Sequence, residues 1–238
     1  MIIPNIDLLR IIFSIIMFSV ASLMDFKNRE IPDRLWIIFG GVSIIMILVE
    51  PDIQHKLIEV GISLIITPVA LLLWRFGIFG GADALCLIVL AALAPQATYS
   101  DKIITPLTTL TNAAILSIVP VFVNITRNLI SIIKHVKIFE GFKESRIRKC
   151  VAMLLGYRTN TGGYYFLMEK TDPDGSKKFD FSIKNAESTE FCRSYNAWAI
   201  PAIPFLIYIF AGFIIQLFIG DMVMNLFSSY TNLSNHGS

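Results

Sequence analysis

The stretch Ile6–Met24, IDLLRIIFSIIMFSVASLM, is apolar apart from two charged residues near its beginning. A membrane-spanning helix needs about 20 mostly apolar residues, because the hydrocarbon core of a bilayer is about 30 Å thick. Of the 238 residues of the chain, 55% are hydrophobic and 16% are charged, whereas soluble domains carry about 25% charged residues. This composition excludes a soluble enzyme and a disordered chain, and it predicts an integral membrane protein.

Five further stretches are apolar enough to cross a bilayer, and none of them alternates as a strand of a membrane barrel does. With the first, the predicted spans are Ile6–Met24, Leu35–Val49, Ile58–Phe76, Asp83–Tyr99, Leu107–Ile133 and Ala197–Ile219. Pro68 and Pro120 fall inside two of them, where a membrane helix tolerates a kink. We therefore predict a polytopic α-helical membrane protein with six transmembrane helices.

A polar insertion separates the fifth span from the sixth. Its first part, Glu140–Leu155, predicts a basic amphipathic helix, and its charges are expected either on anionic lipid or in water. These charges are Lys143, Arg146, Arg148 and Lys149. Tyr164–Lys170 and Lys178–Ile183 flank the turn signal Asp172–Gly175 and predict a β-hairpin. The predicted domains are the membrane region 1–133, the α+β insertion 134–196, the sixth helix 197–220 and the tail 221–238.

The distribution of Lys and Arg predicts the orientation, because cytoplasmic loops are enriched in both. In the six-span topology, 17 of the 20 Lys and Arg residues lie on the side of the insertion, and only Arg10, Lys56 and Lys102 lie on the other side. We therefore expect a multi-pass protein of the cell membrane with both termini extracytoplasmic and the insertion in the cytoplasm. The three tryptophans, Trp36, Trp74 and Trp198, are expected as anchors at the cytoplasmic interface.

Two aspartates stand at the cytoplasmic edge of this topology. Asp25 closes the first span, which runs inward, and Asp83 opens the fourth, which runs outward, so both carboxylates are expected at one depth. Two close carboxyls share a titration, and one keeps its proton. The ionised member can take a proton from water while the protonated member polarises a peptide carbonyl. Gly80 and Gly81 would allow close approach of a substrate backbone and unusual dihedral angles.

Each aspartate also has a purely structural interpretation. Asp83 directly precedes an apolar helix, where it is suited to be the N-cap. Asp25 could be a surface charge paired with Lys27 or Arg29. The coincidence of both acids with a glycine pair on one side of the membrane favours a catalytic pair. Because the acids lie on separate helices, we expect substrate or a helix shift to assemble the site.

These motifs resemble those of the type IV prepilin peptidases, most closely of their archaeal preflagellin (prearchaellin) peptidase branch. The family has a G-x-G-D motif around its second aspartate, and Gly80–Asp83, with Ala82 at the third position, resembles a variant of it. The first motif is matched by Asp25, Arg29, Ile31 and Pro32, with Asp33 where bacterial proteins tend to have Asn.

The resemblance implies an aspartic membrane protease that removes a short basic leader from preflagellin or prepilin-like precursors at the cytoplasmic face. Asp25 and Asp83 would carry the catalysis, without a metal or organic cofactor. The supporting motif residues would be Gly80, Gly81, Ala82 and Pro32. The four-cysteine cluster of bacterial relatives is missing from this sequence, which implies proteolysis without methylation. Because leaders are basic, Glu30 and Asp33 are either leader contacts or solvated loop charges.

Two other classes of function remain open on the sequence alone. A small ion or proton-coupled transporter could use Asp25 and Asp83 to bind cations or relay protons, although neither acid falls in the middle of a span. A non-catalytic subunit of an archaellum or pilus machine would need only the membrane spans. The expected partners are the lipid bilayer and the precursor proteins. The net charge of +2 gives no indication of a nucleic-acid partner.

Overall fold

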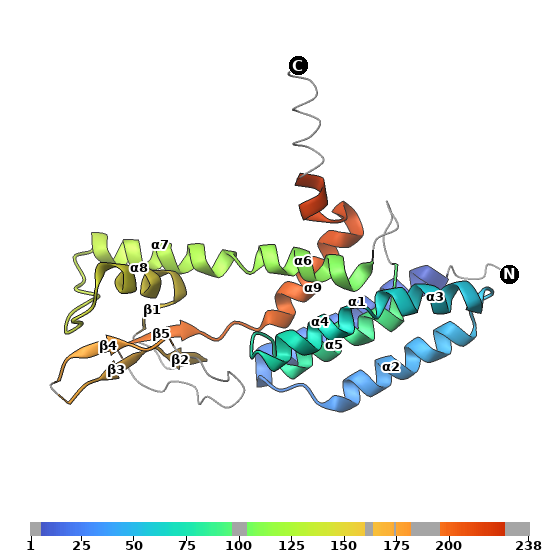
Figure 1. The fold of residues 1–238 in the computed structure, drawn as a ribbon, viewed down its shortest axis with the longest axis horizontal. Coiled ribbons are helices and arrows are strands. Elements are labelled where there is room, and N and C mark those ends of the chain that lie inside the picture. The colour runs from blue at the N-terminus through green and yellow to red at the C-terminus, as the bar shows by residue number, and fades with distance from the viewer. Residues whose placement is uncertain (1–5, 97–103, 160–163, 174, 182–195, 227–238) are drawn as a thin grey trace, which may run out of the picture. The chain divides into compact units, whose positions relative to one another are not determined.

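The fold is described by a computed structural model for residues 6–96, 104–159, 164–173, 175–181 and 196–226 (Figure 1). The chain divides into two compact units. Unit 1 combines Met1–Leu116 with Pro204–Ser238, and unit 2 is Ser117–Ile203. Unit 2 is larger than the predicted insertion 134–196, because the second half of the predicted fifth span packs with the insertion.

In the described residues, unit 1 is built from helices. They are α1 (Ile6–Asn28), α2 (Asp33–Leu48), α3 (Ile53–Ser63), α4 (Ile66–Arg75), α5 (Gly81–Leu93), α6 (Thr105–Leu116) and α9 (Phe205–Ile219). Three apolar stretches, 6–28, 53–75 and 105–133, are long enough to cross a membrane, and α5 and α9 are shorter apolar helices. The prediction of a mostly helical membrane chain with a small strand-containing insertion is therefore confirmed.

Two of the predicted spans are interrupted rather than kinked. The span containing Pro68 consists of α3 and α4, which are separated by a turn at 64–65, and the span containing Pro120 consists of α6 and α7 (Val119–Ile133), separated at 117–118. A proline ring clashes with the carbonyl four residues earlier. Those residues are Leu64, which caps α3, and Leu116, the last residue of α6. Each helix ends where the following proline forbids its continuation.

The predicted sixth span is wrong in its first eight residues. Ala197–Pro201 is the strand β5, and α9 begins only at Phe205, with Pro204 as its N-cap. Two prolines in this short segment lack the N–H groups that a continuous helix needs. The predicted fourth span, Asp83–Tyr99, corresponds to the shorter helix α5, and its residues 97–99 lie outside the described part of the chain.

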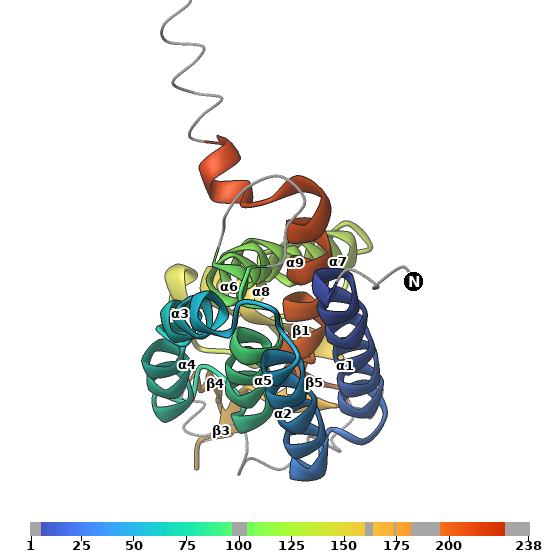
Figure 2. The same ribbon diagram turned by 90° about the vertical axis from the view of Figure 1, so that its right-hand side faces the viewer.

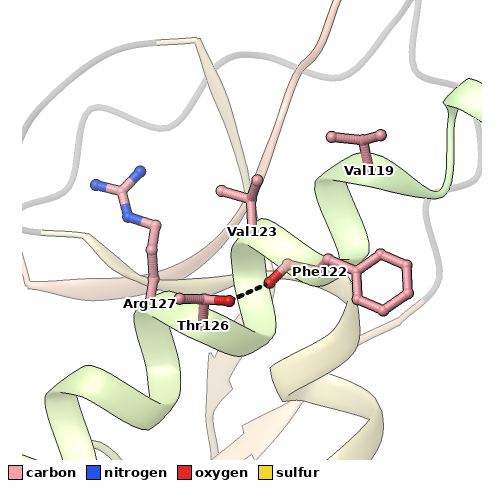
Figure 3. A pocket seen from close by; sticks show the side chains of 5 residues that line it. All are labelled: Val119, Phe122, Val123, Thr126 and Arg127. Carbon is pink, nitrogen blue, oxygen red and sulfur yellow. Dashed lines mark hydrogen bonds between the residues drawn. The ribbon is translucent and has the colours of Figure 1, made fainter.

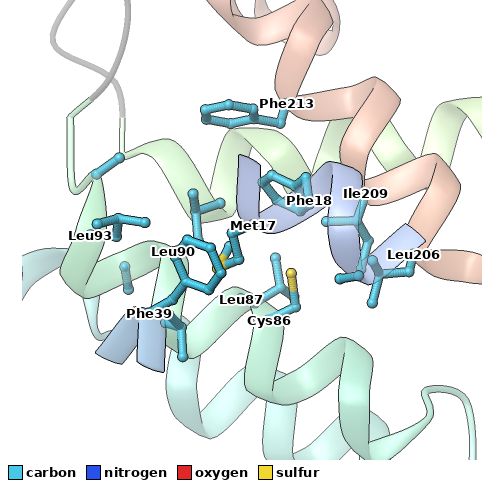
Figure 4. Packing of buried hydrophobic residues seen from close by; sticks show 14 of the residues in the cluster. Met17, Phe18, Phe39, Cys86, Leu87, Leu90, Leu93, Leu206, Ile209 and Phe213 are labelled. Atoms are coloured by element: carbon cyan, nitrogen blue, oxygen red, sulfur yellow. The ribbon is translucent and has the colours of Figure 1, made fainter. Parts of the chain in front are cut away.

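Helix α5 is the central element of unit 1. It packs against α1, α2, α3, α4, α6 and α9, and Figure 2 shows it surrounded by its neighbours. Side chains of α5, α1 and α9 meet in the apolar core shown in Figure 4. The labelled core residues include Met17, Phe18, Cys86, Leu87, Leu90, Leu206, Ile209 and Phe213. Phe18 stacks on Phe210 with a centroid distance of 5.5 Å.

Polar groups also lie inside unit 1, between α6 and α9. Thr109 Oγ1 donates to Gln216 Oε1 at 2.6 Å, and Asn112 Nδ2 donates to the carbonyl of Gly220 at 3.0 Å. A Cβ atom on Gly212 would lie 2.6 Å from the Thr109 carbonyl oxygen, so glycine is what lets the two backbones approach. Small residues and interhelical hydrogen bonds are the usual means of joining helices in lipid.

Unit 2 combines two helices with two small antiparallel sheets. Its elements are α7, α8 (Arg146–Leu155), β1 (Tyr157–Thr159), β2 (Tyr165–Leu167), β3 (Glu169–Thr171), β4 (Lys177–Phe179) and β5. The first sheet has the order β1-β5-β2, and the second is the β3–β4 hairpin. The predicted hairpin around the Asp172–Gly175 turn is therefore present, with shorter strands. Asp174 and residues 182–183 of its predicted limits lie outside the described residues.

Helix α8 starts later than predicted, at Arg146 instead of Glu140. Ser145 is its N-cap and its side chain accepts a hydrogen bond from Arg148 N at 3.4 Å. Gly141, just upstream, has φ +83°, which ends any continuous helix there. Of the four predicted surface charges, Arg148 is paired with Glu144 at 2.8 Å and Lys149 lies over the ring of Phe139. Two of the four basic side chains, Arg148 and Lys149, therefore make contacts within unit 2.

The core of unit 2 is aromatic. Trp198 of β5 is fully buried and donates from Nε1 to the Ile138 carbonyl at 2.7 Å. Phe142 and Phe179 stack at 4.3 Å, and Phe179 meets Trp198 edge to face at 5.3 Å. Such a core resembles that of a small water-soluble domain. The expectation that Trp198 anchors the protein at the membrane interface is therefore wrong.

Candidate active site

Asp25 lies within α1, one turn before its end at Asn28, so it does not close the helix as predicted. Its backbone carbonyl accepts a hydrogen bond from Arg29 N at 3.1 Å. Arg29 itself has φ 59°, the left-handed conformation that ends many helices. The Asp25 side chain is half-buried. The carboxylate is therefore held on a regular helical turn, next to the loop that leads into α2.

Asp83 is the third residue of α5 and is only 8% exposed. Its Oδ2 accepts a hydrogen bond from the backbone N–H of Gly80 at 3.1 Å. Gly80, and not Asp83, is the N-cap, so the aspartate serves as the acidic member of a capping box. A negative charge is also favoured in the first turn of a helix, where the macrodipole is positive. Asp83 therefore does take part in capping α5, but as the third residue of the helix. The N-cap itself lies three residues earlier, at Gly80.

The residues before Asp83 have ordinary backbone geometry. Gly80 has φ −72° and ψ 156°, an extended conformation that any residue adopts, so the expected unusual dihedral angle is absent at this position. Gly81 and Ala82 begin α5 and are partly exposed. Phe79 is buried and contacts the ring of Phe205 at 4.9 Å. The start of α5 is therefore fixed against α9 by an aromatic contact.

The predicted leader contacts lie in the loop between α1 and α2. Glu30 and Asp33 are both exposed. Pro32 is the N-cap of α2 with φ −69°, and its carbonyl accepts from Leu35 N at 3.0 Å. Asp33 is the first residue of α2, where a carboxylate is favoured by the helix dipole. The loop therefore exposes two carboxylates, Glu30 just before α2 and Asp33 at its beginning.

Arg10 joins three helices at one end of the bundle. Its Nη1 donates to the Leu93 carbonyl at 2.9 Å, and its Nη2 donates to the Met46 carbonyl at 3.1 Å. Nη2 also lies 3.0 Å from Oε2 of Glu50. The residue is 2% exposed. The beginning of α1 and the ends of α2 and α5 therefore meet around one buried guanidinium.

The two aspartates consequently lie toward the opposite end of the same helices. Asp25 is fifteen residues after Arg10, a rise of about 22 Å along α1, and Asp83 is ten residues before Leu93, a rise of about 15 Å along α5. Because α1 contacts both α2 and α5, the last turn of α1 and the first turns of α2 and α5 lie at one end. Asp25, Asp83 and the loop with Glu30 and Asp33 share that end.

The structural role of Arg10 is not predicted from the sequence, in which this residue counts only as a charge on the outer side. The sequence does indicate that Arg10 has a partner, because an ionisable side chain inside an apolar span is energetically unfavourable unless it is paired. Glu50, forty residues away, is that partner. A long-range pair of this kind has no signature in the local sequence.

No metal site is formed by the described residues around Asp25 and Asp83. Among the described residues, no three His, Cys, Asp or Glu side chains are placed to hold a metal ion together. An open depression of about 350 Å³ lies on α7, lined by Val119, Phe122, Val123, Thr126 and Arg127 (Figure 3). All five belong to one helix of unit 2, whereas the aspartates belong to unit 1. The depression is a feature of the apolar outer face of α7 and not the candidate active site.

Comparison with known proteins agrees with the motifs. The model of the type IV leader peptidase family matches residues 12–123, which include both aspartates. The chain is 28% identical to a preflagellin peptidase of Methanocaldococcus jannaschii, over 90% of this chain and 95% of the relative. It is 24% identical to a preflagellin peptidase of Methanococcus voltae, over 87% and 93%. A third, from Methanococcus maripaludis, is 25% identical over the same shares. The similarity therefore extends through the insertion.

Proposed function

We propose that the chain is a member of the type IV leader peptidase family, a membrane-embedded aspartic endopeptidase that removes the short basic leader from preflagellin or prepilin-like precursors. The observation that carries the proposal is the similarity to preflagellin peptidases along about 90% of the chain. A peptidase is a hydrolase, so the proposed site must deliver water to a peptide carbonyl. Asp25 and Asp83 are the residues that we assign to this step.

In the proposed mechanism, one carboxylate removes a proton from the attacking water while the other, protonated, donates to the carbonyl oxygen. The proton then passes to the leaving nitrogen as the peptide bond breaks. The helical rise leaves Asp25 about 7 Å further from Arg10 than Asp83 along the two helices. The site therefore needs the bound precursor, or a shift of α1 against α5, to bring both carboxylates to one water.

We propose that six segments cross the membrane, the sixth being α9 (Phe205–Ile219) and not the predicted Ala197–Ile219, with both termini outside and the aspartates at the cytoplasmic face. The asymmetry of Lys and Arg supports this orientation. The division between Arg10 and the aspartates supports it further, since they occupy opposite ends of the same helices. A leader that begins in the cytoplasm would then reach Asp25 and Asp83 without crossing the bilayer.

Basic leaders need an acidic contact, and we assign this role to Glu30 and Asp33. Both side chains are exposed and lie in the loop that follows Asp25. Charge reversal of either residue to Lys should slow cleavage of a precursor with a Lys-rich leader and leave unaffected a precursor whose leader lysines are replaced by Gln. An unchanged rate with the basic leader would remove the docking role and leave the catalytic assignment standing.

The catalytic assignment is tested with purified full-length protein and a precursor peptide in detergent. Asp25→Asn and Asp83→Asn should each lower the cleavage rate on the order of 10²- to 10⁴-fold, the size of a general acid–base contribution. Asp52→Asn is the matched control, because Asp52 caps α3 by accepting from His55 N at 3.1 Å and Asn caps equally well. Substantial cleavage by either catalytic variant would reject the pair. Ion flux in liposomes without cleavage would favour a transporter.

A further inference from the structure

The three tryptophans of the chain have different surroundings. Trp74 is exposed at the end of α4, and Trp198 is buried with its indole N–H bonded to a carbonyl. Trp36, in the first turns of α2, is 5% exposed, and its Nε1 has no hydrogen-bond partner among the described residues. Trp36 is therefore neither an interfacial anchor nor a satisfied core residue.

An unpaired indole N–H in the interior is unfavourable, since leaving a buried donor unsatisfied costs about 1–3 kcal/mol. Among the described residues, the hydroxyls of Ser22, Ser63 and Thr67 and the Nε atoms of Arg10 and Arg29 are also buried without a hydrogen-bond partner. Arg10 makes other hydrogen bonds through its Nη atoms, and Arg29 through its backbone N–H. A hydroxyl can rotate to find an acceptor on its own helix, and it can also accept. The indole N–H is a donor only and is fixed by the ring. Trp36 therefore differs from these groups, because its single polar atom can only donate and has no partner among the described residues.

The position of Trp36 relates it to the proposed active site. It lies ten residues before Met46 on α2, and Asp83 lies ten residues before Leu93 on α5. Arg10 binds the carbonyls of both Met46 and Leu93. Since each interval is a rise of about 15 Å and α2 packs against α5, Trp36 and Asp83 lie at about the same level of the bundle.

We propose that the indole N–H of Trp36 is a substrate-binding donor, which hydrogen-bonds a main-chain carbonyl of the precursor segment that lies at Asp25 and Asp83. This assignment rests on the proposed peptidase function. A peptide drawn into an apolar, low-dielectric site must have its backbone groups satisfied, and a rigid donor provides one partner without loss of side-chain entropy. Because Nε1 is buried in the free protein, the rearrangement that assembles the site must also expose it, and the unfavourable free energy of the unpaired N–H is relieved when substrate binds.

Trp36→Phe tests the proposal, because Phe keeps an aromatic ring and removes the N–H. We expect kcat/KM for precursor cleavage to fall about three- to tenfold, the value of one hydrogen bond. Tm should fall less than in the control below, because only the smaller ring, and not a lost hydrogen bond, destabilises this variant. Trp198→Phe is the matched control, since its N–H is bonded at 2.7 Å to Ile138 O. That control should lower Tm while cleavage per folded molecule stays at the wild-type level. A fall in Tm for Trp36→Phe as large as that for Trp198→Phe, or wild-type kinetics, would overturn the proposal.

Thioamide substitution along the precursor identifies the acceptor, because a thiocarbonyl accepts a weaker hydrogen bond. One position should slow the wild type and have no effect in Trp36→Phe, and the absence of any such position would contradict the assignment. Binding of uncleaved precursor to Asp83→Asn, with and without Trp36→Phe, gives the same comparison without catalysis. If the wild type does not cleave the precursor, the proposed function fails, whereas equal affinities in the binding comparison reject only the role of Trp36.

Discussion

Both units have an apolar core, but unit 1 and unit 2 differ in the polar groups that they bury and in the side chains that they expose. Unit 1 buries Arg10, Asn112 and Gln216, while Ile37 on its surface is 72% exposed. Unit 2 buries an aromatic core and places ion pairs such as Lys178–Asp172 on its exterior. We therefore expect unit 1 to lie in lipid and the strands of unit 2 to lie in water, since lipid favours an apolar surface with polar contacts between helices, and water favours a polar surface over an apolar core.

Helix α7 departs from this pattern. It packs in unit 2, but like the helices of unit 1 it buries polar side chains and exposes apolar ones. Asn124 and Asn128 face inward and donate to the carbonyls that end α8, from 2.8 to 3.1 Å. Phe122 and Ile133 point outward and are largely exposed. A helix with its polar face inside and its apolar face outside is suited to lipid, so this face of unit 2 is expected to meet the membrane.

The largest effect that separates the two units is expected for Arg10→Met. Removing the guanidinium leaves Glu50 and two helix-end carbonyls without their donor in a buried place, a loss on the order of 3–5 kcal/mol. Lys170→Met is the control in unit 2, where the side chain is 71% exposed and paired with Asp180, and such surface pairs contribute at most about 1 kcal/mol. Thermal unfolding in detergent compares the two. If Arg10→Met and Lys170→Met lowered Tm by the same small amount, the contacts of Arg10 would not be important for the stability of unit 1.

A second comparison uses glycines at close contacts. Gly212→Ala in unit 1 and Gly156→Ala in unit 2 would each place a Cβ against backbone, 2.6 Å from Thr109 O and 2.3 Å from Ala199 O. Both variants should lose about 1–3 kcal/mol, because backbone atoms cannot move aside cheaply. Gly61→Ala, with nothing within 4 Å, should be neutral or stabilising by about 0.5–1 kcal/mol in its helix. A stable Gly212→Ala variant would contradict the close α6–α9 packing.

Much of this architecture could be predicted from the sequence, and the exceptions have physical causes. Hydropathy located the apolar segments, and the turn residues Asp172–Gly175 located the hairpin. Hydropathy averages do not register that a proline excludes helix four residues earlier, so the interruptions after Leu64 and Leu116 were read as kinks. Ala197–Pro201 is as apolar as a span, and its strand conformation depends on pairing with β1 and β2, which are distant in sequence.

The candidate site was predictable for a different reason. Asp25 and Asp83 are identified by motifs and by their places at the ends of apolar segments, which are local properties. The partners of Arg10 and the unpaired N–H of Trp36 are tertiary properties, and no spacing in the sequence indicates them. A capping role of Asp83 was predicted, but its position in the cap depends on where the helix begins. The N-cap of α5 is Gly80, which makes Asp83 the third residue of the helix.

A smaller effect tests the inward polar face of α7. Asn128→Ala removes the donor to Met153 O and Gly156 O and should lower stability by about 1–3 kcal/mol, because two buried carbonyls lose their partner. Thr126→Val is the control on the outward side of the same helix, where the hydroxyl only bonds back to Phe122 O. With Trp36 and Trp74 both replaced by Phe, the fluorescence of Trp198 during thermal unfolding reports on unit 2. If both variants unfold alike, the asparagine contacts do not fix α8 to α7.

The smallest effect is confined to alkaline pH and to unit 2. Burial, and secondarily the hydrogen bond with Tyr165, raise the pKa of Tyr157 to about 12, although the Arg127 guanidinium over its ring opposes the rise. A phenol whose pKa is higher in the folded than in the unfolded chain stabilises the fold fully below the unfolded value near 10. That stabilisation is lost as the pH rises from about 10 through about 12. Tm of unit 2 should therefore fall more steeply over this range in the wild type than in Tyr157→Phe. Parallel pH profiles for the two proteins would show that Tyr157 titrates alike in the folded and unfolded chains.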